Sequence, residues 1–524
     1  MSNVAVARLT VGGIADRKSS MPYNLFWASQ KELRDISVAP IPQIYVQPHE
    51  DDISHIQALI IGPPGTPYSF GFFRFDMRFP ADYPNNAPTV HITTTDAGKV
   101  RFNPNLYAGG KVCLSILGTW HGESNEQWSA VQSISSILLS IQSLLCERPY
   151  HNEPGFEARD STDDVEQYND KIVHDTLRVS ICGQLEELLR HIDLESTSPR
   201  AASSSSRSVT PTSSAAHSDS TSVTPSDAPG PSSSTSAAPP SAPGTSKEPP
   251  KNSRGDFYQW EYREWNPFTD VMKREFLLRF DTYLAVAEKE RTKHKDGSMF
   301  RKMPFEAPGN GMFGNFDYTS IVLRLNNIKA KLTQETRKWE EKGVELTKND
   351  TYAATRLKME IDRLKREPIE GVSCGPISDS NVFVWEATIF GEEYTPWEGG
   401  MYNLQMVFNE RYPDDPPRLQ FSSSCRMFHP NITSDGIPLY TGPTFREFES
   451  NSSGHSNSNK RARSMARGGD SITDILVAVK DLLRKPPQTS VTAILNPEAA
   501  QLYSTNPKEY NRRVRRLVQQ SLGS

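Results

Sequence analysis

The stretch from Phe102 to Trp120, FNPNLYAGGKVCLSILGTW, carries the strongest chemical signal in the 524-residue chain. Cys113 follows a glycine-rich turn, and an Asn-Pro-Asn tripeptide lies eight to ten residues before it. Apolar residues on both sides of Cys113 would anchor the backbone and leave the thiol facing outward. The Asn105 carboxamide could then donate a hydrogen bond to the oxygen that gains charge when a carbonyl at Cys113 is attacked. This arrangement predicts acyl transfer through a thioester.

The alternative for a single cysteine is that it serves as a small buried apolar residue. Two further motifs argue against that alternative: Gly62–Tyr68 (GPPGTPY) and Phe79–Pro88 (FPADYPNNAP) precede the Cys113 stretch. In this order and at this spacing, the three motifs resemble those of the ubiquitin-conjugating enzyme family. The Asn-Pro-Asn form, Gly118–Trp120 and Tyr150–Phe156 resemble the Z-type branch of that family. The resemblance covers roughly residues 20–195.

Composition and charge exclude several classes of protein. The formal net charge is −5, which argues against bulk nucleic-acid binding and against a basic membrane surface. No apolar run approaches the roughly 20 residues of a spanning helix, and Met1–Ala5 lacks the features of a signal peptide. Five scattered cysteines without a Cys-x-x-Cys pair fit a reducing compartment and no zinc site. We therefore expect an intracellular, cytoplasmic chain with no metal, no cofactor, no nucleic-acid partner and no membrane partner.

The N-terminal region predicts a mixed α+β domain. A short amphipathic helix over Tyr23–Ile36 precedes four strand candidates that are separated by proline-rich turns. The candidates are Gln43–Gln47, His55–Ile61, Phe72–Phe79 and Thr89–Thr94. A helix over Ser129–Leu145 follows, with Val131 on its apolar face, and we expect Trp120 and Trp128 to pack under the cysteine loop. A run of strands followed by helices is typical of the α+β class, and the resemblance implies the same fold.

The middle of the chain divides by composition. A helical pattern runs to about Ile192, and residues 196–252 are then mostly Ser, Pro, Ala and Thr, which predicts a disordered linker. Helical spacing returns over Val271–Lys295 and from Phe316 to about Trp339, with Leu323 among the apolar positions. This part resembles the C-terminal helical extension of the Z-type enzymes. It is either a buttress against the first domain or a surface that narrows which activating enzyme or ubiquitin-like protein docks.

A second copy of the same motifs follows, without the nucleophile. A helix over Thr355–Glu367, a strand over Val382–Phe390 and the tripeptide His429-Pro430-Asn431 resemble the common form of the family. Eight residues after Asn431, where the first copy has its cysteine, stands Leu439. A leucine cannot form a thioester, so we predict an inactive domain whose second site comprises His429, Asn431 and Leu439.

The predicted fold class is therefore α+β, with two ubiquitin-conjugating-type domains, a helical extension and a disordered linker. Each domain is expected to hold a four-stranded antiparallel sheet with flanking helices. The predicted parts are a catalytic domain (20–195), the linker (196–252), the extension (253–345) and the inactive domain (346–524), which carries a disordered insertion (449–470). The basic run Lys460–Arg463 in this insertion is either a nuclear-import patch, which would add a nuclear location, or a solvated loop.

The resemblance implies a role for each residue of the first site. Cys113 accepts the activated C-terminus of ubiquitin, and Asn105 matches the asparagine that supports the oxyanion. Asn103 replaces the usual histidine and is expected to make a structural hydrogen bond. Asn152 stands at the gate position, where many members hold an acidic residue, and Glu153 is the nearest carboxylate that could act as a local base or orienter. The alternative for these last two residues is a plain surface turn.

Tyr107 is expected either to shape the rim of the site or to pack. The leading hypothesis for the whole chain is a transferase that takes ubiquitin or a ubiquitin-like protein from an activating enzyme and passes it to lysines of protein substrates, usually with a ligase. The inactive copy would bind ubiquitin, a ligase or a substrate and raise its local concentration through the tether. The alternatives are a non-catalytic ubiquitin-binding adaptor and, less consistent with the isolated cysteine, a thiol-redox regulator.

Overall fold

The computed structural model describes residues 23–49, 52–120, 127–158, 162–192, 266–306, 311–440 and 471–522 of the chain. The predicted linker (196–252), the predicted insertion (449–470) and the run Lys460–Arg463 lie outside these residues. Within them the fold is α+β with two separate four-stranded antiparallel sheets, which confirms the predicted fold class. No helix in the described ranges is long and apolar enough to cross a membrane.

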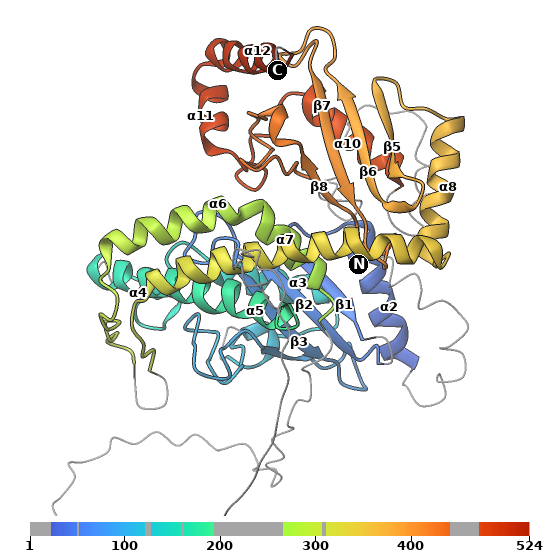
Figure 1. The fold of residues 1–524 in the computed structure, drawn as a ribbon. Coiled ribbons are helices and arrows are strands. Elements are labelled where there is room, and N and C mark those ends of the chain that lie inside the picture. The colour runs from blue at the N-terminus through green and yellow to red at the C-terminus, as the bar shows by residue number, and fades with distance from the viewer. Residues whose placement is uncertain are drawn as a thin grey trace, which may run out of the picture. The chain divides into compact units, whose positions relative to one another are not determined.

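The first sheet is a meander in which each strand pairs with the next one in the chain (Figure 1). Its strands are β1 (Ile44–Pro48), β2 (His55–Ile61), β3 (Phe72–Arg78) and β4 (Thr89–Ile92). Alternate side chains of a strand point to opposite faces, and here both faces are buried. Phe73, Phe75 and Met77 contribute to one core, whereas Phe72 belongs to a second core on the other face.

Two helices that flank the strands in sequence complete the first core. They are α2 (Tyr23–Val38) and α3 (Ile134–Leu144). The predicted start of α3 at Ser129 is wrong, because Ser133 caps the helix. The Ser133 hydroxyl accepts a hydrogen bond from the Ser136 N–H, and the Ser136 hydroxyl accepts one from the Ser133 N–H. Val131 therefore lies before the helix and is 91% exposed rather than on its apolar face.

Of the two tryptophans expected under the cysteine loop, only Trp128 packs. Its Nε1 donates to the Pro84 carbonyl at 2.8 Å, and its ring lies 5.9 Å from that of Tyr83. Trp120 is 43% exposed, so the expectation for it is wrong. The physical reason is the preceding Gly118, whose left-handed φ of 65° ends the short turn Ser115–Leu117 and sends the chain toward solvent.

A long helical segment contributes to both cores: Tyr168 and Ile172 belong to the first core, and Ile181 and Leu185 belong to the second. It consists of α4 (Thr162–Asp175), the π-helical turn η3 (Thr176–Gly183) and α5 (Gln184–Leu188). A Cβ atom on Gly71 would lie 2.6 Å from the Ser180 Oγ and 2.7 Å from the Thr176 Cγ2. Glycine at this position therefore lets η3 approach the start of β3, and the sequence pattern did not predict the widened turn.

The helices α6 (Thr269–Lys293) and α7 (Tyr318–Lys348) share the second core with this segment and with the outer face of the sheet. Phe276 and Leu325 are fully buried there, and the Tyr283 hydroxyl donates to the Phe70 carbonyl at 2.9 Å. This packing is that of a buttress. Leu323, expected in the core, is 61% exposed because it lies on the opposite side of α7.

The second sheet repeats the meander of the first in residues 372–421. Its elements are α8 (Tyr352–Arg366), β5 (Val372–Ser378), β6 (Asn381–Phe390), β7 (Met401–Val407), β8 (Arg418–Phe421), α10 (Ile472–Arg484), α11 (Pro497–Thr505) and α12 (Pro507–Leu522). Helix α7 contacts β6, and the Asn381 Nδ2 donates to the Glu340 carbonyl at 2.8 Å. Helix α7 runs unbroken to Lys348 and therefore crosses the predicted boundary between residues 345 and 346. The division of the chain into these domains stays a prediction.

Buried charges tie α6, α7 and β8 together. The Lys273 Nζ of α6 lies 2.5 Å from the Glu335 Oε1 of α7, with side-chain exposures of 8% and 10%. Arg418 of β8 lies 3.5 Å from Asp270 and 3.9 Å from Glu335. Breaking a buried pair leaves an uncompensated charge, so these contacts matter more than the ion pairs at the surface.

We expect Glu335→Ala to lower the free energy of unfolding by about 3–5 kcal/mol, because it leaves Lys273 buried without its partner. The matched control is Glu341→Ala on the same helix, which removes the Arg337–Glu341 pair, exposed at 68% and 62%. This control should lose less than about 1 kcal/mol. Urea unfolding of both variants measures the difference, and equal small losses would contradict the prediction.

Candidate functional site

Reciprocal hydrogen bonds hold the Cys113 segment against the Asn-Pro-Asn turn. The Cys113 N–H donates to the Asn105 carbonyl, and the Asn105 Nδ2 donates to the Cys113 carbonyl, both at 2.9 Å. Leu106 and Val112 form a β-bridge between the two segments. Beyond the cysteine, the Thr119 hydroxyl donates to the Val112 carbonyl at 2.8 Å and accepts from the Leu114 N–H at 2.9 Å. The backbone of Cys113 is thus fixed on both sides.

The outward-facing thiol expected from the sequence is not observed, since Cys113 is only 3% exposed. Tyr107 stands six residues before it, and its side chain is half-buried. Burial, together with the negative charge that Cys113 and Glu153 can carry, raises the pKa of the Tyr107 hydroxyl. Hydrogen bonds fix the backbone of Cys113, and the fold buries its side chain.

The carboxamide of Asn105 is held by the backbone of the cysteine itself. Its Nδ2 bonds to the Cys113 carbonyl, and its Oδ1 is buried without a hydrogen-bond partner among the described residues. To support an oxyanion at Cys113, the Nδ2 must give up or share this bond. The oxyanion role of Asn105 stays a prediction.

Asn103 is completely buried and takes part in a network below the site. Its Oδ1 accepts from the Asn105 N–H at 3.0 Å, and its Nδ2 donates to the Leu144 carbonyl at 2.8 Å and to the Tyr68 hydroxyl at 3.0 Å. Asn152 joins the same network, donating from its Nδ2 to the Leu144 carbonyl at 3.1 Å. The carboxamides of Asn103 and Asn152 therefore hold their two loops against the end of α3.

Glu153 is paired with a buried arginine. Its Oε2 lies 3.3 Å from the Nη2 of Arg101, a residue that is 2% exposed. Burial raises the pKa of the Glu153 carboxyl, and the Arg101 guanidinium opposes that shift. Sequence reasoning missed Arg101, although an arginine next to the Phe-Asn-Pro-Asn motif was the available signal.

The second copy places Leu439 where the first copy has its cysteine. The Leu439 N–H donates to the Asn431 carbonyl at 2.8 Å, and Ile432 bridges to Pro438. These are the contacts that Cys113 and its neighbours make in the first copy. The second copy thus keeps the backbone geometry of the site and lacks the nucleophile, as predicted.

The asparagine and histidine of the second site are held by hydrogen bonds. Asn431 donates from its Nδ2 to the carbonyls of Gln488 (2.8 Å) and Ala493 (2.9 Å), and its Oδ1 accepts from the Gln488 N–H at 2.8 Å. The His429 Nδ1 accepts from the Asn431 N–H at 3.0 Å, just as Asn103 accepts from Asn105 in the first copy.

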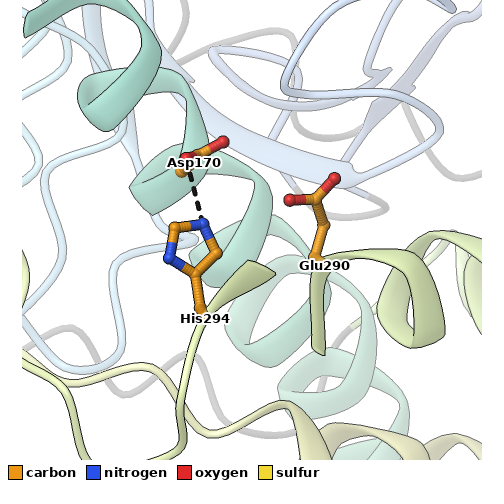
Figure 2. A group of neighbouring side chains, drawn as sticks. All are labelled: Asp170, Glu290 and His294. Atoms are coloured by element: carbon orange, nitrogen blue, oxygen red, sulfur yellow. Dashed lines mark hydrogen bonds and ion pairs between the residues drawn. The ribbon is translucent and has the colours of Figure 1, made fainter. Parts of the chain in front are cut away.

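Asp170, Glu290 and His294 form a cluster whose ligand atoms lie within 4.8 Å of one another (Figure 2). Their geometry would suit a cation, but a lysine already neutralises the carboxylates. The Lys293 Nζ lies 2.9 Å from Glu290 and 3.9 Å from Asp170, and the His294 Nε2 lies 3.0 Å from Asp170. We interpret the cluster as an ion-pair network that joins α4 to the end of α6.

Two regions of the chain, each with a four-stranded meander, are similar to one protein family. Residues 28–174 and 356–437 match the family model "Ubiquitin-conjugating enzyme". The two matched regions together make up less than half of the chain, and the second one ends two residues before Leu439.

Among relatives, the N-terminal region resembles ubiquitin-conjugating enzyme E2 Z. Over 157 residues it is 51% identical to the protein from Homo sapiens and 52% identical to that from Danio rerio. These matches cover 30% of this chain and 44% and 47% of the relatives, so the chain spans less than half the length of either protein. A region of 148 residues is 43% identical to the human "Dual E2 ubiquitin-conjugating enzyme/E3 ubiquitin-protein ligase BIRC6", covering 27% of this chain and 3% of that protein.

We expect the second domain to lose stability in acid because of His429. Burial lowers the pKa of His429 to about 4, whereas an exposed histidine has a pKa near 6.5. The unfolded chain therefore binds a proton that the folded chain excludes, and the free energy of unfolding falls as the pH drops from about 6.5 to about 4. The full effect is about 3 kcal/mol.

The variant His429→Asn, which copies the residue of the first site, should remove this pH dependence. The measurement is urea unfolding of the wild type and the variant at pH 7 and pH 4.5. The exposed His191 supplies the control, His191→Asn, which should keep the pH dependence of the wild type. If His429→Asn leaves the change in unfolding free energy between pH 7 and pH 4.5 as it is in the wild type, His429 is not its source.

Proposed function

We propose that this chain is a ubiquitin-conjugating enzyme whose nucleophile is Cys113. The Cys113 thiolate attacks the thioester of an activating enzyme, a new C–S bond forms, and the thiol of the activating enzyme leaves. A substrate lysine then attacks the carbonyl as a free amine; the C–S bond breaks and an amide forms. The observation that carries this proposal is the pair of hydrogen bonds between Asn105 and Cys113, in a region that is 51% identical to human E2 Z.

The proposed roles follow the hydrogen bonds of the site. Asn105 supports the oxyanion with the Nδ2 that now bonds to the Cys113 carbonyl. Asn103 and Asn152 hold the Asn-Pro-Asn turn in place, since both donate hydrogen bonds to the Leu144 carbonyl. Glu153 orients the site through Arg101; its pairing with a buried cation suits this role better than that of a free base.

The partners of the chain are part of the proposal. They are ubiquitin or a ubiquitin-like protein, an activating enzyme, a ligase and protein substrates, in the cytoplasm and, if Lys460–Arg463 directs import, in the nucleus. The proposed parts are the catalytic domain (20–195), the linker (196–252), the extension (253–345) and the inactive domain (346–524). The inactive domain serves as a tethered binding module that raises the local concentration of one of these partners.

The decisive experiment is a non-reducing gel of the full chain with ubiquitin, an activating enzyme and ATP. We expect a band that thiol reagents remove, and we expect Cys113→Ala to abolish it. Cys113→Ser should instead give a thiol-resistant ester of the same mass, because an oxygen ester resists thiols. If the band fails with ubiquitin and with ubiquitin-like proteins across several activating enzymes, the adaptor alternative replaces the enzyme.

Restoring a cysteine to the second site should not restore activity. In Cys113→Ala/Leu439→Cys the new thiol stands at the position of the nucleophile, but three hydrogen bonds hold the carboxamide of Asn431 away from it. We expect no thioester on the gel that detects the wild-type adduct. An adduct comparable to that of the wild type would show that the missing thiol is the only defect of the second site.

A further inference from the structure

The peptide unit that precedes Asn105 is held at both of its ends. The Pro104 carbonyl accepts a hydrogen bond from the Arg101 Nη2 at 2.6 Å, and the Asn105 N–H donates to the Asn103 Oδ1 at 3.0 Å. The orientation of this peptide unit sets the direction in which the Asn105 side chain leaves the backbone. A group that acts during a reaction works best when its position is set beforehand. Arg101 therefore binds the part of the backbone that aims the Asn105 carboxamide.

The guanidinium of Arg101 is buried, and hydrogen bonds fix only one of its nitrogens. The residue is 2% exposed, and the same Nη2 lies 3.3 Å from the Glu153 Oε2. Its Nε and Nη1 are buried without a hydrogen-bond partner among the described residues. A guanidinium carries five N–H donors in one plane, and bonds through a single nitrogen leave that plane free to rotate. Other contacts must therefore hold it.

Two aromatic rings supply these contacts. The Arg101 Cζ lies 4.8 Å from the ring centroid of Tyr107 and 5.9 Å from that of Phe305, both within the range of a cation–π contact. Tyr107 is close to Arg101 in the sequence, whereas Phe305 belongs to the segment between α6 and α7. The helical extension thus reaches a cation that binds the Asn-Pro-Asn turn.

Phe305 is itself fixed by its surroundings. Its ring packs against three others, with centroids 5.4, 5.5 and 5.9 Å away: Tyr150, Phe156 and Tyr168. The buried Glu306 anchors the backbone of the segment by accepting from the N–H groups of Met303 (2.9 Å) and Met312 (2.8 Å). A ring that is held in this way can limit the movement of the guanidinium beside it.

We propose that Arg101 is a positioning residue for Asn105, and that Phe305 of the extension holds Arg101 in place. The consequence for catalysis rests on the proposed function, in which the Asn105 carboxamide supports the oxyanion. Arg101 acts on Asn105 through the Pro104 carbonyl. A lysine at this position keeps the charge but lacks the planar group, so it cannot bond to Pro104 and stack on the rings at once. The extension thereby contributes to the accuracy of the site.

Hydrogen exchange of the full chain tests the positioning without a modifier or an activating enzyme. Mass spectrometry follows the peptide that contains Asn105 and Cys113, since both amides donate hydrogen bonds within the site. We expect Arg101→Lys and Phe305→Leu to speed exchange there, Phe305→Leu by roughly 2- to 30-fold, the factor that corresponds to one lost cation–π contact. Phe305→Tyr returns a ring and should keep the wild-type rate.

Two controls accompany this measurement. A peptide that contains Cys182, which is fully buried, reports any general loosening of the fold and should exchange as in the wild type. The matched variant is Phe313→Leu in the same segment, where the side chain is 78% exposed and no change is expected in either peptide.

A double-mutant cycle tests whether Arg101 acts through Asn105. The rate measured is single-turnover transfer from the Cys113 thioester to free lysine. We expect Arg101→Lys to slow it by roughly 10- to 150-fold, the factor for one hydrogen bond to a charged group, and Phe305→Leu by roughly 2- to 30-fold. Asn105→Ala should by itself cost about 100- to 1,000-fold, and in that background the other two changes should cost little more. A merely structural role would slow both backgrounds equally.

Two results would overturn the proposal. If Phe305→Leu leaves exchange of the Asn105 peptide unchanged, or speeds the Cys182 peptide as much, the extension does not hold Arg101. If Arg101→Lys slows transfer as much in Asn105→Ala as in the wild type, Arg101 does not position Asn105. If no thioester forms with any modifier, the proposed function fails, and the exchange rates decide on their own whether Arg101 and Phe305 fix the turn.

Discussion

The first domain depends on one exchange of hydrogen bonds, in which Asn105 and Cys113 each bond to the carbonyl of the other. The exchange fixes the position of a single sulfur atom relative to the Asn-Pro-Asn turn. Asn103 supports the turn from inside the core through the end of α3. A nucleophile can act on an incoming carbonyl only when its position is set in advance, and here backbone groups set it.

The second domain shows that the backbone arrangement and the chemistry are separable. Leu439 makes the backbone bond that Cys113 makes, and His429 accepts the bond that Asn103 accepts. The differences lie in the side chains: the sulfur is missing, and Asn431 is held by the loop over residues 488–493. The loop also contacts α6, because Arg279 donates to the Thr492 carbonyl and, just after the loop, to the Ile494 carbonyl at 3.0 Å. The second site, although it lacks a cysteine, thus has a structural role: Asn431 holds a loop that also binds α6.

The helical extension contacts both domains. Helices α6 and α7 bury the outer face of the first sheet and share buried ion pairs with β8 of the second domain. Phe305, which follows α6, reaches the guanidinium beside Tyr107. The extension therefore packs against a buried residue next to the Asn-Pro-Asn turn.

The sequence by itself determined which residue can be a nucleophile, that the second copy has none at the matching position, and most strands and helices of the first domain and the extension. These conclusions depend on residue identity and on local spacing, which the chain carries without folding. Only the tertiary structure decided that Cys113 is buried, that Val131 and Trp120 are exposed, and that Arg101 stands beside Tyr107. Burial and hydrogen bonding depend on residues that meet across the sheet and the extension, so periodicity cannot reveal them. The turn η3 depends likewise on the space left by Gly71, a neighbour only in the fold.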